Sequence, residues 1–122
     1  MRLILVVDDE AIIRDLICDV LESEGFVTEP KANADLAVEF LTQRSSEVAL
    51  LLTDINMPGS MNGAVLANLS AHSWPTIPVV VMSGLESPES AGLNKDVIFI
   101  RKPFSLDNVL DCVHLALRKA RA

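Results

Sequence analysis

The sequence VALLLTD occupies residues 48–54, where six uncharged residues end on a carboxylate, Asp54. A short, continuous run of aliphatic residues is typical of a strand that is buried on both faces of a parallel sheet. The sequence LILVVDD at residues 3–9 has the same form, because its apolar run ends on Asp8 and Asp9. Both stretches therefore predict central strands with acidic side chains at their carboxyl ends.

Working outward from these two runs, the rest of the chain alternates between strand and helix patterns. Three weaker apolar runs predict further strands at residues 26–29, 77–82 and 97–100. Helical spacing of apolar residues predicts a helix from about Ile13 that ends before Gly25, and a closing helix that carries Leu106 to Leu117. Between them, Asn33 is a candidate N-cap of a second helix, and a third is expected around residues 62–71.

This order of elements predicts an α/β fold. Five strands alternate with about five helices, which gives a doubly wound five-stranded parallel sheet with helices on both faces. The fourth helix should be short or irregular, because Pro88 and Gly92 interrupt residues 86–95. The 122 residues are expected to form one domain, 1–122, with a core that needs no disulfide or structural metal.

Composition excludes several classes of protein. With 10 Lys and Arg residues against 17 Asp and Glu residues, the net charge is −7, which disfavours direct nucleic-acid binding. No apolar run is long enough to span a bilayer, and the start lacks a secretory signal pattern. Cys18 and Cys112 have no partner at metal-ligand spacing and are expected to be buried thiols in a reduced compartment. A cytoplasmic protein is therefore expected.

Five polar residues each follow a predicted strand: Asp8, Asp9, Asp54, Ser83 and Lys102. The carboxyl ends of parallel strands share one edge of the sheet, and ligands bind in the crevice outside it. Taken singly, each has a simple structural explanation, as a helix cap, a turn residue or an exposed lysine. Their shared position instead predicts that they converge on one site.

The chemistry of these five residues suits a phosphoryl group and a divalent cation. Neighbouring carboxylates repel one another, and an oxygen-bound Mg²⁺ removes that cost. No His or Cys lies among them, which argues against zinc. Lys102, Ser83 and the backbone of Gly84 are suited to hold phosphate oxygens, while Asp54 is a candidate nucleophile for an aspartyl-phosphate. His72 and His114 lie away from this edge and are interpreted as surface residues, and Trp74 as a packing residue.

On these residues, the chain resembles the receiver domain of bacterial two-component response regulators over essentially its whole length. The resemblance implies the flavodoxin-like strand order 2-1-3-4-5. Four segments carry it, in order and each at a predicted strand end: residues 5–10 (LVVDDE), 52–59 (LTDINMPG), 81–84 (VMSG) and 101–104 (RKPF).

The resemblance implies a role for each residue of the metal site. Asp54 corresponds to the phosphoacceptor, and Asp9 to the direct Mg²⁺ ligand. Asp8 corresponds to its acidic neighbour, and the backbone carbonyl of Asn56 completes the site. Mn²⁺ is expected as a substitute ion.

It also implies a switch. Ser83 corresponds to the hydroxyl that turns toward the phosphoryl group, Lys102 to the lysine that pairs with the phosphate, and Phe99 to a rotating aromatic residue. Asn56 and Leu85 stand where the family tunes hydrolysis. Because Leu85 is apolar and cannot position a water, slow autodephosphorylation is expected.

The chain departs from the common family pattern at three places. The loop from Met57 to Gly63 is one residue longer than usual, and Gly84 stands where alanine is commoner. The interval from Ser83 to Phe99 is short, which puts the usual receiver dimer in doubt. A monomer or a phosphorylation-dependent dimer is expected.

The leading hypothesis is therefore a phosphorylatable switch that is not itself an enzyme in the ordinary sense. A histidine kinase or histidine phosphotransfer protein donates the group to Asp54, and the changed surface signals to a downstream protein. The alternative is a pseudo-receiver, a protein-interaction module that works without phosphorylation. A stand-alone phosphatase lacks an acid to protonate the leaving group. The start at Met1 favours a complete or N-terminal receiver.

Overall fold

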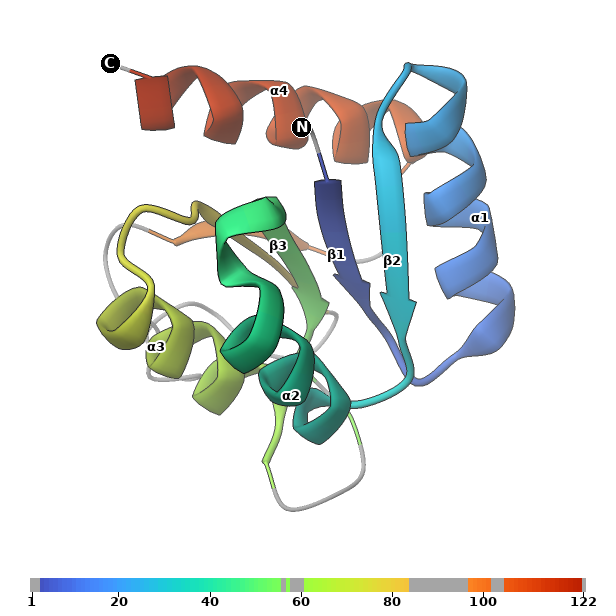
Figure 1. Cartoon of the computed structure of the whole chain (residues 1–122). Helices are drawn as coiled ribbons and strands as arrows, with labels where there is room; N and C mark the ends of the chain where they lie inside the picture. Colours follow the sequence, from blue (N-terminus) through green and yellow to red (C-terminus); the bar gives the residue numbers. More distant parts are fainter. Residues whose placement is uncertain (1–2, 56, 58–60, 84–96, 102–104, 122) are drawn as a thin grey trace.

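The computed structural model describes residues 3–55, 57, 61–83, 97–101 and 105–121 (Figure 1). Four α-helices and five strands lie in these ranges. In chain order they are β1 (Leu3–Val7), α1 (Ala11–Ser23), β2 (Val27–Lys31), α2 (Ala34–Arg44), a 3-10 turn η1 (Ser45–Glu47), β3 (Val48–Asp54), α3 (Gly63–Ser73), β4 (Val79–Ser83), β5 (Ile98–Arg101) and α4 (Leu106–Arg121). Within the described residues, no helix has both the length and the apolarity to cross a membrane.

The five strands form one parallel sheet in the order β2-β1-β3-β4-β5. The predicted fold class and strand order are thereby confirmed. The β4 strand begins two residues later than the sequence suggested, because Ile77 is still in a turn in which its N–H donates to the carbonyl of Trp74 over 3.0 Å. The predicted short fourth helix falls in residues 86–95, which lie outside the described residues.

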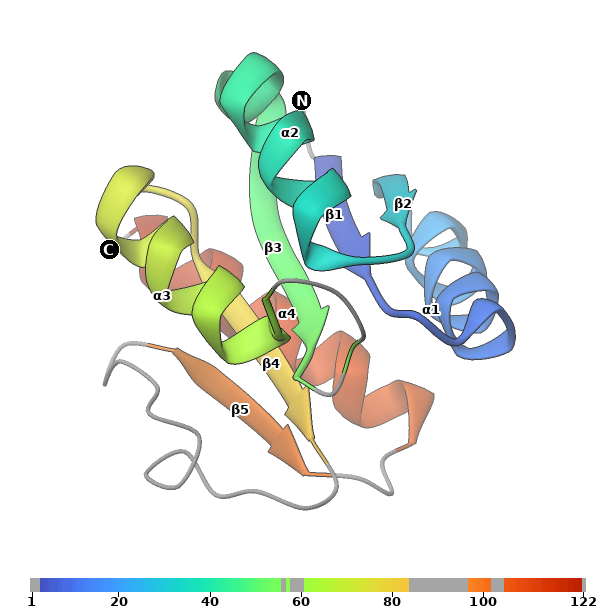
Figure 2. The ribbon, with the colours of Figure 1, turned by 90° about the horizontal axis from the view of Figure 1, so that it is seen from below.

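Helices cover both faces of the sheet (Figure 2). On one face α2 and α3 pack against Leu3, Leu5 and Val7, while on the other α1 and α4 pack against Ile4 and Val6. Successive residues of a strand point to opposite faces, so a central strand with two covered faces needs apolar residues at every position. This is why β1 and β3 read as unbroken apolar runs.

The helix ends follow local signals in the sequence. The Asn33 side chain accepts a hydrogen bond from the N–H of Leu36 (2.9 Å), and so caps α2 as predicted. At the end of α1, Gly25 has a φ of 90°, and the N–H of Phe26 donates to the carbonyl of Leu21 over 3.1 Å. This is a Schellman motif, which confirms Gly25 as the helix stop.

Gly63, the first residue of α3, lies directly against the backbone that follows β3. Its N–H donates to the carbonyl of Ile55 over 2.9 Å. A Cβ at this position would overlap the carbonyl group of Asp54 and come within 2.8 Å of the Cα of Ile55. Glycine is therefore required here for space, whereas Gly25 is required for its backbone conformation.

These two glycines give a matched pair of substitutions. Gly63→Ala should lower the free energy of unfolding by about 1–3 kcal/mol, because α3 must move off the Asp54 backbone. Gly25→Ala has open space for its methyl group and should cost about 1–2 kcal/mol through its positive φ alone.

Urea unfolding gives both energies, and amide NMR shifts tell the two causes apart. Only Gly63→Ala should displace the resonances of Asp54 and Ile55. Wild-type shifts at both residues in a folded Gly63→Ala protein would show that the close approach is not a constraint.

Candidate functional site

Three of the predicted site residues lie on adjacent strands at the carboxyl edge of the sheet. Val7 of β1 pairs with Thr53 of β3, so that Asp8 and Asp54 are the next residues along two neighbouring strands. Asp54 in turn pairs with Met82, one residue before Ser83 at the end of β4. The edge therefore brings together polar residues from β1, β3 and β4, as the sequence predicted.

These three side chains are buried although they are polar. The exposed fraction is 0% for Asp8, 1% for Asp54 and 0% for Ser83. Asp9 is exposed at the start of the following turn. Burial of carboxylates is costly unless other groups or a cation compensate for the lost water. Two buried aspartates at the ends of neighbouring central strands therefore make this edge the candidate site.

Within the described part of the chain, three hydrogen bonds that involve Asp8 hold the turn between β1 and α1. The Asp8 N–H donates to the carbonyl of Lys31 on β2 (3.1 Å), which continues the sheet pairing. Its Oδ1 accepts from the N–H of Glu10 (2.9 Å). Its backbone carbonyl accepts from the guanidinium Nη1 of Arg14 (2.7 Å). Asp8 is thus fixed through its amide, its carboxylate and its carbonyl.

The same turn gathers three carboxylates that are able to hold a cation. One carboxylate oxygen each from Asp8, Asp9 and Glu10 lies within 4.8 Å of the others. An all-oxygen donor set, with one buried and two exposed members, fits a hard divalent cation that keeps part of its water. Glu10 was not predicted as a member of this group. Its position directly after the two aspartates was the available signal.

The backbone around Asp54 is held on both sides. The N–H of Ile55 donates to the carbonyl of Met82 (3.0 Å), which extends the β3–β4 pairing by one residue. The Thr53 hydroxyl donates to the carbonyl of Asp54 (2.9 Å), against which Gly63 also packs. The position of the Asp54 Cα therefore depends on the sheet and on the first residue of α3.

Of the remaining predicted residues, the structure describes Phe99. Phe99 on β5 is half-buried and packs against the core on the α2 and α3 face, and its neighbour Val81 lies two residues before Ser83. Asn56, Gly84, Leu85 and Lys102 lie outside the described residues.

The histidines and cysteines lie on other parts of the molecule. His72 is exposed as expected, whereas His114 is half-buried, with its ring 5.8 Å from that of Phe26. Cys18 is buried as predicted, and burial raises the pKa of its thiol above the ordinary value. Cys112 is only half-buried, but burial raises the pKa of its thiol too. Both cysteines are free thiols.

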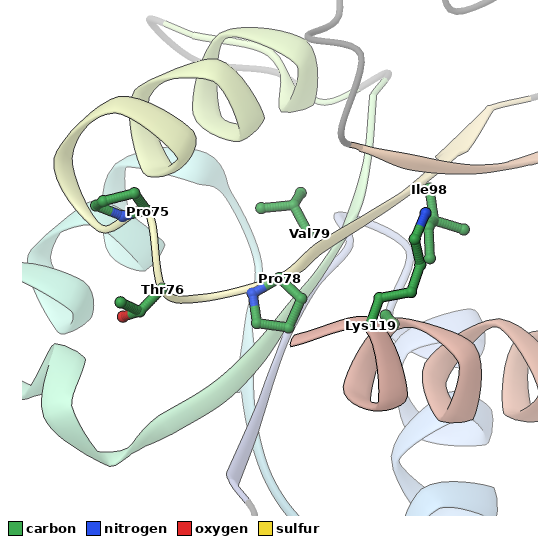
Figure 3. Close-up of a pocket in the computed structure, with 7 residues that line it drawn as sticks. Pro75, Thr76, Pro78, Val79, Ile98 and Lys119 are labelled. Carbon is green, nitrogen blue, oxygen red and sulfur yellow. The ribbon is translucent and has the colours of Figure 1, made fainter. Parts of the chain in front are cut away.

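A cavity of about 350 Å³ opens at the other edge of the sheet, where β4 and β5 begin (Figure 3). Figure 3 shows Pro75 and Pro78 on one side and the Lys119 side chain of α4 on the other. Its lining is Pro75, Thr76, Pro78, Val79, Ile98, Ala116 and Lys119. None of these residues belongs to the acidic edge, so the cavity is separate from the candidate site.

Comparison with known proteins agrees with this geometry. The response regulator receiver domain family matches residues 4–114. The phosphate regulon transcriptional regulatory protein PhoB of Escherichia coli is 34% identical over 122 residues, which cover 97% of this chain and 52% of PhoB. The nitrogen assimilation regulatory protein NtrX of Azorhizobium caulinodans is 33% identical over 122 residues, which cover 97% of this chain and 26% of NtrX.

Solved structures show the same likeness. A response regulator receiver protein from Sinorhizobium medicae superimposes with a TM-score of 0.89 at 27% identity, over 98% of this chain and 96% of that one. The receiver domain of NtrX from Brucella abortus gives a TM-score of 0.81 at 34% identity, over 94% of this chain and 98% of that one. The chain spans 26% of NtrX from A. caulinodans and 52% of PhoB. By the family match over residues 4–114, the chain belongs to the response regulator receiver domain family.

Proposed function

We propose that this chain, residues 1–122 taken as one receiver domain, accepts a phosphoryl group on Asp54 and acts as a two-component signalling switch. The observation that carries the proposal is the burial of Asp8, Asp54 and Ser83 at the carboxyl ends of three adjacent strands whose cores are apolar. Buried, neighbouring carboxylates at a ligand-binding edge are kept at a cost in stability, which favours a functional reason for them.

The acidic turn supports a divalent cation in this proposal. Asp8, Asp9 and Asp54 would hold Mg²⁺ together with the backbone carbonyl of Asn56, and Mn²⁺ would substitute for it. When bound, the ion would neutralise negative charge on the carboxylates and on the phosphoryl oxygens. Asp9 and Glu10 are exposed, so a phosphoryl donor could reach the acidic turn from solvent.

The protein's own residues supply a nucleophile and its positioning. A carboxylate oxygen of Asp54 forms a bond to phosphorus as the bond from phosphorus to the donor's histidine nitrogen breaks. The electron pair stays on that nitrogen, and the imidazole leaves. Ser83 and Lys102 would hold the phosphoryl oxygens, and Phe99 would follow the movement of Ser83. The backbone bonds on either side of Asp54 fix the position of its Cα, and positioning of the reacting groups is the main contribution of such a site.

A histidine kinase or a histidine phosphotransfer protein is the proposed donor, and a downstream protein is the proposed receiver of the signal. The free thiols of Cys18 and Cys112 agree with the reduced, cytoplasmic setting that we propose for this exchange. The side of the site on which the donor docks should include the start of α1. There, Ile12 is 77% exposed only two residues after Glu10.

The first test is phosphoryl uptake by the nucleophile. With acetyl phosphate and Mg²⁺, intact mass should show one phosphoryl group on the wild-type protein and none on Asp54→Asn. Asp19→Asn, a change of an exposed aspartate on α1, is the matched control and should be phosphorylated normally. Equal uptake by Asp54→Asn and wild type would place the acceptor elsewhere.

The cation gives a second test on the same protein. Removal of Mg²⁺ with a chelator should abolish uptake, and Mn²⁺ should restore it. A protein that takes up no phosphoryl group under any of these conditions, yet binds a partner equally well with and without the phosphoryl donor, would be a pseudo-receiver instead.

The docking of the donor can be separated from the chemistry by one surface substitution. Ile12→Gln should lower kcat/KM for transfer from a phosphorylated histidine protein by about tenfold, because an exposed apolar contact worth about 1.4 kcal/mol is lost. Phosphorylation by acetyl phosphate, which needs no docking surface, should stay unchanged.

The matched control is Leu115→Gln, which removes a 42% exposed leucine from the half of α4 farther from the acidic edge. It should leave both rates unaltered. An Ile12→Gln protein that accepts the group from the histidine protein at the wild-type rate would remove α1 from the docking surface.

A further inference from the structure

Arg14 is bonded to the acidic turn although it lies on the helix that follows. It is half-buried on α1, four residues after Glu10, and its N–H donates to the Glu10 carbonyl (2.9 Å) as part of the helix. Its side chain reaches back a further two residues, where Nη1 donates to the carbonyl of Asp8 (2.7 Å). Helix and turn are therefore joined by a backbone bond and a side-chain bond from one residue.

The bond goes to a neutral carbonyl rather than to a carboxylate. Asp8, Asp9 and Glu10 crowd the turn, yet among the described residues Arg14 makes no ion pair with any of them. A guanidinium that served only to neutralise charge would be expected against a carboxylate oxygen. The directed bond to the backbone indicates that Arg14 holds the shape of the turn.

The turn needs such support because the negative charges of its side chains repel one another. Carboxylate oxygens from three consecutive residues lie within 4.8 Å of one another, and their mutual repulsion favours an opened turn. The Asp8 carbonyl is part of the planar peptide group that joins Asp8 to Asp9, so a bond at that carbonyl also fixes the orientation of the Asp9 N–H. Groups that orient the ligands of a metal in this way commonly change its affinity by about 10–100-fold.

We propose that Arg14 is a positioning residue for the divalent-cation site, which it keeps in a cation-ready arrangement before the ion binds. The inference rests on the proposed function, because it assumes that the acidic edge takes Mg²⁺. It adds that the affinity and the size selectivity of the site depend on a helix residue that does not ligate the ion. A turn held to one shape should favour small Mg²⁺ over larger Ca²⁺, whereas a relaxed turn should accept both.

The test compares cation affinities of the whole chain, measured by calorimetry and by the amide NMR shifts of Asp9 and Glu10. Arg14→Met keeps the apolar stem but has no donor, and it should bind Mg²⁺ about tenfold or more weakly. Its preference for Mg²⁺ over Ca²⁺ should fall as well, which a general loss of stability would not produce. Arg14→Lys keeps a charged donor and should recover part of the affinity.

Arg118→Met is the matched control, since it removes the same charge from an exposed position on α4 and should bind Mg²⁺ as the wild type does. Equal or tighter Mg²⁺ binding by Arg14→Met, beside normal binding by the wild type, would overturn the positioning role while leaving the proposed function intact. A wild-type protein that binds no Mg²⁺ would overturn both.

Discussion

The structure depends on one constraint, which is that the central strands of a parallel sheet covered on both faces have room for charged side chains only at their ends. The helices α2 and α3 on one side and α1 and α4 on the other leave β1 and β3 without a solvated face. Asp8 and Asp54 can exist in these strands only because they come at the carboxyl edge. The same constraint that makes the core apolar therefore concentrates the chemistry in one place.

The carboxylates gathered at the acidic edge lower the stability of the fold. Each buried carboxylate loses water on folding, and neighbouring carboxylates add repulsion to that loss. A ligand that binds only the folded protein shifts the folding equilibrium toward the native state. A ligand that compensates for these charges would therefore also stabilise the fold. Among the described residues, the acidic turn after β1 gathers three carboxylates within 4.8 Å of one another, so a cation bound there would offset their repulsion and stabilise the fold.

Much of this could be predicted from the sequence, because the decisive signals were local. Apolar runs located β1 and β3, the residue after each run located the edge, and Asn33 and Gly25 located helix ends. The contacts that hold the site together could not be read in this way. The bond from Arg14 to Asp8 and the packing of Gly63 on Asp54 join separate elements in space, and no spacing of residue types encodes them. Lys102 and Asn56 lie outside the described residues, and their roles stay predictions.

The contact between Gly63 and the Asp54 backbone has a mechanical consequence. No side chain separates the two segments, so nothing between them can deform to absorb a small movement. The bond from Gly63 to the Ile55 carbonyl joins the start of α3 directly to the residue that follows β3. A displacement of the Asp54 and Ile55 backbone must either strain that bond or carry the start of α3 with it. The start of α3 is in this sense coupled directly to the neighbouring strand, and α3 follows a shift of the backbone around Asp54.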